Sequence, residues 1–322
     1  MGLDLGGTRI KAGLLDPSST VISSTTDPTP TDSRPEVVVE ALDKVARRLV
    51  TEAGRSWDDV TGVGIGVPGL IDSGTGIVRA CVNLKGWKDV ELRELAGQAM
   101  GRRVVVDNDA NAAAFGEYSI ALKRNTGLKH LALITLGTGV GSGIVLNRRV
   151  FHGGGGLAGE VGHMIVVPNG HLCGCGQYGC LEQYASATAM VRQANELIEA
   201  GKRSSLQSLV RHGLLTTQDV FSAAAEGDLV AERLVDDLAY YLAIACVNLC
   251  RLIDLQAIVI GGGVANAGDG LIKPLRREFS RQNWGIAGGV MPNLSVTELG
   301  NDAGFIGAAA LAMAELDDGP HG

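Results

Sequence analysis

Residues 159–182, GEVGHMIVVPNGHLCGCGQYGCLE, hold three of the chain's six cysteines and two of its six histidines. Cys173, Cys175 and Cys180 fall within eight residues of one another, and His163 precedes the first cysteine by ten positions. Three thiolates and one imidazole make a complete tetrahedral ligand set for Zn²⁺, with no position left for a catalytic water. The stretch therefore predicts a structural zinc site formed by these four residues.

Two alternatives stay open at this point. His171 lies two residues before Cys173 and is a competing fourth ligand. A glycine-rich loop with free or buried thiols is the alternative to any metal site.

A closed zinc site would serve to hold Glu160, His163 and Glu182 in fixed relative positions. Carboxylates accept hydrogen bonds from hydroxyl groups, and a metal-bound imidazole keeps its second ring nitrogen for another partner. These side chains therefore suit a polyol ligand. The pattern GE-x-GH followed by C-x-CG-x2-GC-x-E resembles the signature of the ROK family, which comprises sugar kinases and sugar-responsive repressors.

The composition is that of an ordinary soluble chain of one or two domains, with 322 residues of which 45% are hydrophobic and 20% charged. The net charge of −7 argues against a nucleic-acid or anionic-membrane surface. The longest apolar helical run, residues 238–250, is too short to cross a bilayer. Because thiolate ligands suit a reducing compartment, we expect a cytoplasmic protein with no nucleic-acid or membrane partner.

Two segments, residues 3–15 and residues 131–146, each read as strand, glycine turn and strand. Glycines without a Cβ let backbone N–H groups converge on phosphate oxygens, and Thr8 and Thr138 add hydroxyl donors. Asp4, just before the first turn, is placed to hold the water shell of Mg²⁺. An ordinary hairpin loop is the alternative for either copy taken alone. The pair predicts a phosphate clamp, and it is not a P-loop because no G-x4-GK[ST] occurs.

The two turns resemble the phosphate motifs of the actin-like and sugar-kinase ATPase fold, and the opening D-x-GGT resembles ROK kinases. The strand and glycine turn AIVIGGGVA, residues 257–265, resemble the adenosine motif of that family, although a plain strand-to-helix loop is an alternative. The residues expected to bind ATP and its Mg²⁺ are Asp4, Gly6, Gly7, Thr8, Lys11, Gly137, Thr138, Gly139, Gly141, Gly261, Gly262 and Gly263.

The stretch 102–118, RRVVVDNDANAAAFGEY, predicts a buried strand that runs into an alanine-rich helix. Asn108 and Asp109 lie at this junction, where open α/β sheets place their ligands. Phosphoryl transfer to an alcohol needs an acceptor for the hydroxyl proton, so Asp109 is the candidate general base and Asn108 a positioning donor. The alternative is that one of them only caps the helix. NDANAAAFGE resembles the ROK glucokinase pattern, which implies the catalytic role for Asp109.

Other candidates for the sugar site come from loops. Asn83 and Trp87 offer an amide and an indole to a sugar, with a surface loop and a packed tryptophan as the alternative. The family resemblance implies that Gly69, in a G-x-PG loop, lines the sugar pocket. The formal G-x-G-x2-G at residues 64–69 does not predict a dinucleotide site, because Pro68 interrupts it. The expected sugar-binding residues are Gly69, Asn83, Asn108, Asp109, Glu160, His163 and Glu182.

Apolar periodicity predicts an amphipathic helix over 35–53, several helices over 185–255 and a close-packed helix over 303–316. We expect a two-domain actin-like α/β fold with an interdomain cleft. Residues 1–108 plus 303–322 would form a small N-terminal α/β domain completed by the C-terminal helix. Residues 109–302 would form a large α/β domain that carries the zinc-binding loop.

These expectations describe an ATP-dependent kinase that phosphorylates the C6 hydroxyl of glucose. Mannose, fructose, N-acetylglucosamine and N-acetylmannosamine are alternative substrates, because one pocket frame serves them all. A sugar-sensing repressor is disfavoured, because such proteins carry a helix-turn-helix before the D-x-GG turn and only three residues precede Asp4 here. The family resemblance also implies a homo-oligomer, either a dimer or a tetramer.

Overall fold

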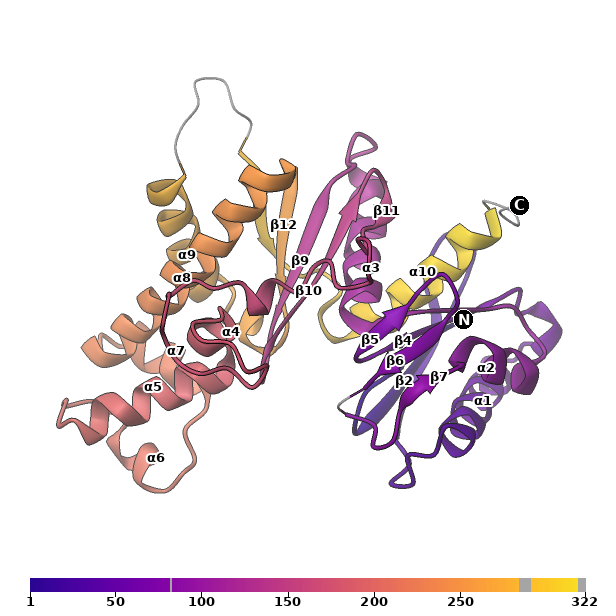
Figure 1. Ribbon diagram of the computed structural model, residues 1–322, viewed down its shortest axis with the longest axis horizontal. Coiled ribbons are helices and arrows are strands. Elements are labelled where there is room, and N and C mark those ends of the chain that lie inside the picture. The colour runs from indigo at the N-terminus through magenta and orange to yellow at the C-terminus, as the bar shows by residue number, and fades with distance from the viewer. Residues whose placement is uncertain (82, 284–290, 318–322) are drawn as a thin grey trace. The chain divides into compact units, whose positions relative to one another are not determined.

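The computed structural model describes residues 1–81, 83–283 and 291–317 (Figure 1). The chain forms two compact units. Unit 1 comprises Met1–Lys129, Gly143–Gly159 and Leu299–Gly322, and unit 2 comprises His130–Ser142 and Glu160–Glu298. This division differs from the boundary expected at residue 108, because residues 109–129 and 143–159 belong to unit 1.

Unit 1 is built on a five-stranded sheet of order β3-β2-β1-β4-β8. Strands β1, β2 and β3 pair antiparallel, while β1, β4 and β8 pair parallel. Its strands are β1 (Gly2–Leu5), β2 (Arg9–Leu15), β3 (Val21–Pro28), β4 (Val63–Val67) and β8 (Val104–Asn108). A smaller sheet contains β5 (Leu70–Asp72), β6 (Ile77–Ala80) and β7 (Lys88–Val90). The first predicted strand–turn–strand segment is thereby confirmed.

The helices of unit 1 follow the predicted apolar patterns. They are α1 (Pro35–Glu52), η1 (Trp57–Asp59), α2 (Leu92–Met100), α3 (Asp109–Arg124), η4 (Gly300–Asp302) and α10 (Ala303–Asp317). In α1, Val38, Leu42 and Leu49 are buried, as the spacing predicts. The helix expected over 303–316 is confirmed as α10, which packs against α3 and against strands β1 and β4.

The packing of α10 on α3 depends on glycines. A Cβ on Gly307 would collide with the carbonyl oxygen of Ala112, and a Cβ on Gly116 would lie 2.8 Å from the carbonyl oxygen of Ala303. Backbone therefore meets backbone between the two helices, which leaves no room for a side chain. This contact is why residues 109–124 belong to unit 1.

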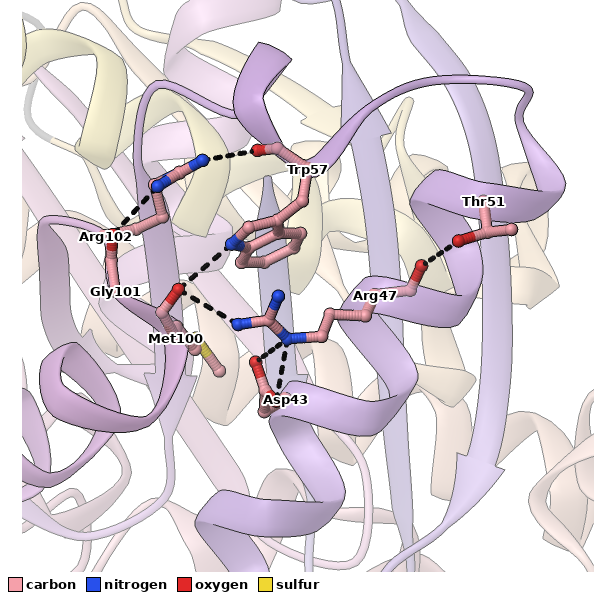
Figure 2. Close-up of polar contacts among 7 residues, drawn as sticks. All are labelled: Asp43, Arg47, Thr51, Trp57, Met100, Gly101 and Arg102. Atoms are coloured by element: carbon pink, nitrogen blue, oxygen red, sulfur yellow. Dashed lines mark hydrogen bonds and ion pairs between the residues drawn. The ribbon is translucent and has the colours of Figure 1, made fainter.

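Trp57 joins three elements of unit 1 (Figure 2). Its indole N–H donates to the Met100 carbonyl at 3.0 Å, at the end of α2. The Arg47 guanidinium from α1 stacks 4.6 Å from the ring centroid and also donates to the Met100 carbonyl. Asp43 binds the Arg47 Nε at 2.8 Å, and Arg102 donates to the Trp57 carbonyl at 2.9 Å. The cluster fixes α1 and α2 to the 3₁₀ turn that precedes β4.

The second five-stranded sheet has the order β11-β10-β9-β12-β13. Its strands are β9 (Leu131–Leu136), β10 (Val140–Leu146), β11 (Arg149–Val150), β12 (Ala257–Gly261) and β13 (Asn293–Val296). The second predicted strand–turn–strand segment and the strand before the three glycines are therefore confirmed. Strand β12 pairs parallel with both β9 and β13.

The remaining helices belong to unit 2. They are η2 (Val161–His163), α4 (Glu182–Ala185), α5 (Ala187–Glu199), α6 (Gln207–Arg211), α7 (Thr217–Ala225), α8 (Leu229–Ile253), η3 (Gly263–Ala267) and α9 (Asp269–Gln282). The apolar stripe of α8 is buried at Leu238, Leu242, Ala245 and Leu249. Within the described ranges, the chain contains no helix of the length and apolarity that crossing a bilayer requires.

Replacing Gly307 by alanine tests the α3–α10 packing. We expect Gly307→Ala to lower the free energy of unfolding by about 2 kcal/mol, because a methyl group would force two helix backbones apart. The matched control is Gly97→Ala in α2, where the nearest atom to the new Cβ is a carbonyl oxygen at 3.7 Å. The control should be neutral or stabilising by about 0.5–1 kcal/mol. Urea unfolding followed by circular dichroism measures both, and equal stability of the two variants would contradict the packing argument.

Candidate functional site

The junction of β8 and α3 carries the candidate base. Asn108 is the N-cap of α3, and its side-chain oxygen accepts hydrogen bonds from the N–H groups of Ala110 at 2.9 Å and Asn111 at 3.2 Å. Its amide nitrogen donates to the carbonyl of Gly69 at 3.1 Å. Asn108 therefore caps the helix. Asp109 follows as the first residue of the helix, and the cap determines where its carboxylate stands.

Asp4 at the first glycine turn lies within electrostatic reach of Asp109, although the two residues are far apart in the sequence. Burial, followed by the negative charge of Asp109, raises the pKa of Asp4 to about 6, while Lys11 lowers it. Two neighbouring carboxylates, one of them largely withdrawn from water, are stabilised by a cation. Oxygen ligands of this kind fit Mg²⁺ with its water shell.

The first glycine turn is closed by a hydrogen bond from the Gly6 N–H to the Arg9 carbonyl at 2.9 Å. A Cβ on Gly7 would lie 3.3 Å from the Cβ of Asn83, so the turn packs against the loop that carries this sugar-binding candidate. The Lys11 ammonium donates to the Asn301 carbonyl at 2.6 Å. The structure therefore brings together, within unit 1, the predicted phosphate turn and two predicted sugar-binding residues, Asn83 and Asp109.

Trp87 does not offer its ring to a ligand, contrary to the first of the two interpretations of this loop. The side chain is only 3% exposed, and its indole N–H donates to the Ser33 carbonyl at 2.6 Å. The alternative, a packed tryptophan, is confirmed. Asn83 in the same loop is exposed.

Asp107 and His152 are a pair that the sequence patterns missed. The Asp107 carboxyl is 4% exposed, and one oxygen lies 2.8 Å from Nε2 of His152. Its other oxygen accepts from the Asn108 N–H at 2.7 Å and from the Asn111 side-chain amide at 3.0 Å. An acid at the end of a buried strand was the available signal, but nothing local pointed to its partner 45 residues later.

In unit 2, the second and third glycine turns lie at the same end of the sheet. The Gly137 N–H donates to the Gly139 carbonyl at 2.9 Å, which closes the β9–β10 turn. Gly262 follows β12 with φ +81°, and a Cβ there would collide with the Leu136 carbonyl at the end of β9. The two segments predicted to bind nucleotide are therefore neighbours. Only glycine permits the approach at residue 262.

Glu182 connects the β9–β10 turn to the cysteine loop. One carboxylate oxygen accepts from the Val140 N–H at 3.0 Å, and the other lies 3.7 Å from the Cys173 sulfur. A Cβ on Gly139 would collide with the Glu182 carboxylate, so the glycine makes room for this contact. Glu160, at the start of the 3₁₀ turn η2, is exposed.

The four predicted metal ligands converge. The candidate ligand atoms of His163, Cys173, Cys175 and Cys180 all lie within 4.8 Å of one another. The sulfurs of Cys175 and Cys180 are 3.7 Å apart, and the Cys173 sulfur is 3.8 Å from Nδ1 of His163. Zn–S bonds of about 2.3 Å in a tetrahedron place neighbouring sulfurs about 3.8 Å apart, which agrees with the observed spacing.

The competing fourth ligand, His171, does not fit the geometry of the cluster. His171 stacks on Tyr184 with ring centroids 5.4 Å apart and is not among the four grouped residues. All six cysteines are free, and the 3.7 Å between the Cys175 and Cys180 sulfurs is far longer than a disulfide bond of about 2.05 Å. The Gln177 N–H lowers the pKa of Cys175, whereas burial and the neighbouring thiols raise the pKa of Cys180. A cation is needed to hold three thiolates together.

Comparison with known proteins identifies the family. The sequence pattern that defines the ROK family matches residues 1–315. The chain belongs to the ROK family. It is 41% identical over 315 residues to the glucokinase of Halalkalibacterium halodurans. The aligned region covers 97% of this chain and 94% of the relative.

Solved structures of ROK proteins share this architecture. A ROK family glucokinase from Streptomyces griseus, in complex with glucose and AMPPNP, superposes with a TM-score of 0.80 at 35% identity, covering 98% of this chain and 99% of the other. The ROK hexokinase from Thermus thermophilus gives a TM-score of 0.81 at 36% identity, covering 99% of both chains. The predicted actin-like α/β sugar-kinase fold is therefore confirmed for this ROK protein.

The contact of Glu182 with the β9–β10 turn gives a testable prediction. Gly139→Ala should displace the Glu182 carboxylate from the Val140 N–H and lower the free energy of unfolding by about 1–2 kcal/mol. Gly137→Ala is the matched control, because a Cβ there meets no atom within 4 Å. The control should stay within about 0.5 kcal/mol of the parent chain. If both variants unfold at the same denaturant concentration, Gly139 does not make room for Glu182.

Proposed function

We propose that this ROK protein is an ATP-dependent kinase that transfers the γ-phosphate of ATP to the C6 hydroxyl of glucose. The observation that carries the proposal is the juxtaposition of Asp109 with Asp4, an acid at a glycine turn suited to phosphate. Full-length similarity to glucokinases, one of them solved with glucose and AMPPNP, supports the same reaction.

The nucleotide would be held by backbone groups of the three glycine turns. The Gly6 and Gly137 N–H groups close their own turns, so Gly7 and Thr8 would donate to phosphate oxygens together with Thr138 of the second turn. Residues 261–263 would pass beside the adenosine. Asp4 would bind the water shell of Mg²⁺. When bound with ATP, Mg²⁺ supplies positive charge to the phosphates. Lys11 adds a fixed positive charge beside Asp4, as its effect on the Asp4 pKa indicates.

The hexose would be held by carboxylates, amides and one imidazole. We propose that Glu160, Glu182 and Nε2 of His163 accept or donate hydrogen bonds to its hydroxyl groups, together with Asn83 and the second amide proton of Asn108. The Gly69 carbonyl is bound to Asn108, so this loop would shape the pocket wall.

Asp109 would accept the proton of the C6 hydroxyl as that oxygen attacks the γ-phosphorus. A bond forms between the sugar oxygen and phosphorus, the bond to the bridging oxygen breaks, and ADP leaves with the electron pair. The helix cap at Asn108 holds the base in line with its proton, which removes the need to order it during the reaction.

We propose that the cysteine cluster binds Zn²⁺ as a structural ion, bound by His163, Cys173, Cys175 and Cys180. The tetrahedral spacing of the ligand atoms supports zinc, and four protein ligands leave no place for a reacting water. The ion would order the loop that carries His163 and Glu182. Thiolate ligands also support the cytoplasm as the site of action.

The base assignment predicts the behaviour of Asp109→Asn. This variant should keep its glucose affinity and lose about 10²–10⁴-fold in kcat, because the amide cannot accept the proton. A coupled assay of ADP release with ATP and Mg²⁺ measures kcat, and calorimetry measures glucose binding. Mannose, fructose, N-acetylglucosamine and N-acetylmannosamine are run beside glucose.

The matched control for this experiment is Asp269→Asn, which changes an exposed acid in the first turn of α9. It should turn over like the parent chain. Near-parental turnover of Asp109→Asn would remove Asp109 as the base. A preference for another sugar would keep the chemistry and change the substrate, and absence of turnover on every sugar would contradict the kinase.

The zinc assignment predicts that Cys175→Ala loses the metal and much of the glucose affinity together, because the ion orders the sugar-binding loop. Metal analysis of the purified protein should find about one zinc per parent chain and none in the variant. Cys250→Ala is the control, since Cys250 lies in α8 outside the four-residue cluster. Full zinc occupancy in Cys175→Ala would show that the ligand set is wrong.

A further inference from the structure

The Asp107–His152 pair contacts the first turn of α3, which carries the residue proposed as the base. Asp107 precedes Asn108 and Asp109, and its carboxylate holds groups on both sides of Asp109. One oxygen accepts from the Asn108 N–H, before the base, and from the Asn111 side chain, after it. The first turn of α3 is therefore tied at two points to one carboxylate.

The second oxygen of Asp107 is oriented by His152. The two atoms are 2.8 Å apart, and the Asp107 side chain is 5% exposed while the imidazole side chain is 30% exposed. A buried carboxylate needs a partner that compensates its charge. Burial works against the charged imidazole, but the hydrogen bond and the charge of Asp107 raise the pKa of His152 above its ordinary value. The contact with Asp107 therefore makes the cationic form of His152 more stable than it is in water.

The backbone on both sides of His152 is fixed. The Phe151 N–H donates to the Ile144 carbonyl of β10 at 2.8 Å, and the His152 carbonyl accepts from the Ala158 N–H at 3.2 Å. These bonds anchor the imidazole at the start of the glycine loop 153–156. An imidazole held in this way can determine the rotamer of the Asp107 carboxylate.

A ligand-facing role for His152 is less consistent with these contacts than a role through Asp107. His152 lines a cavity of about 880 Å³ that includes Phe115 of α3 and Leu311 of α10, so it is open to solvent from that side. Its Nε2 is bound to the Asp107 carboxylate. A small added molecule can therefore reach this position from the cavity. The hydrogen bond of the ring, however, goes to Asp107 in β8, next to the start of α3.

We propose that His152 is a positioning residue for the phosphoryl transfer, and that it acts through Asp107 to hold the first turn of α3 and the base Asp109 in the reactive orientation. The proposal rests on the proposed kinase function. Displacing a base slows the chemical step, while every group proposed to bind ATP stays in place. Loss of His152 should therefore lower kcat without changing KM for ATP.

Two substitutions separate this role from simple packing. His152→Gln keeps an N–H donor at the same number of bonds from the backbone, whereas His152→Leu keeps a similar volume and removes the donor. We expect kcat within about twofold of the parent for His152→Gln and about 10–100-fold lower for His152→Leu, with KM for ATP unchanged in both. Equal kcat values for the two variants would overturn the proposal.

A third variant, His152→Ala, tests whether a loss of activity comes from the missing hydrogen bond or from misfolding. His152→Ala leaves a space that borders the cavity, so added imidazole should restore part of its kcat at a pH where imidazole is neutral. N-methylated imidazole, which then carries no N–H, should restore less. Absence of any difference between the two compounds would contradict a hydrogen-bonding role. Thermal unfolding of each variant is measured in parallel, and a melting temperature equal to the parent in a slow variant supports positioning over stability.

The double variant His152→Leu with Asp109→Asn distinguishes this proposal from the proposed function. If His152 acts through Asp109, its loss should cost nothing further once Asp109 is gone. A full additional loss in the double variant would show that His152 acts elsewhere. If instead Asp109→Asn alone is fully active, the base assignment fails, and the comparison of His152→Gln with His152→Leu still reports on the pair.

Discussion

The close approach of α3 to its neighbours determines where the candidate base stands. Gly143 of β10 would place a Cβ 2.6 Å from the Ala110 carbonyl, and Gly307 of α10 would place one against Ala112. A Cβ on Gly66 of β4 lies only 3.3 Å from the Ala112 side chain. Three glycines on three elements thus hold the same helical turn. Side chains would move the helix, and Asp109 with it, away from Asp4.

A similar constraint operates in unit 2 through the cysteine cluster. The four candidate ligands come from a loop with little regular structure, so an ion bound there would order it. The Glu182 carboxylate extends this order to the β9–β10 turn through the Val140 N–H. The contacts of Glu182 therefore connect the candidate sugar-binding loop of this unit to its candidate nucleotide-binding turn.

The sequence predicted those parts of the protein that depend on local patterns. Glycine turns, the strand before NDANAAAFGE and the spacing of Cys173, Cys175 and Cys180 are local signals, and the structure contains each of them. Apolar spacing also located α1 and α10. Family resemblance added the fold, which local signals alone leave open.

Contacts between distant segments could not be predicted in this way. The pairing of Asp107 with His152 depends on how β8 and the segment after β11 come together, and neither residue lies in a recognisable motif. The burial of Trp87 depends on the Ser33 carbonyl, a partner 54 residues away. The division of the chain differed from expectation for a related reason. Helix α3 follows its glycine contact with α10 rather than its position in the sequence.

The most direct test of the account is a crystal structure with glucose, Mg²⁺ and a non-hydrolysable ATP analogue. The account predicts that the glucose O6 atom lies within hydrogen-bonding distance of the Asp109 carboxylate, about 2.6–3.2 Å, with the γ-phosphate on the other side of that oxygen. A glucose bound with O6 away from Asp109, or facing another carboxylate, would contradict it.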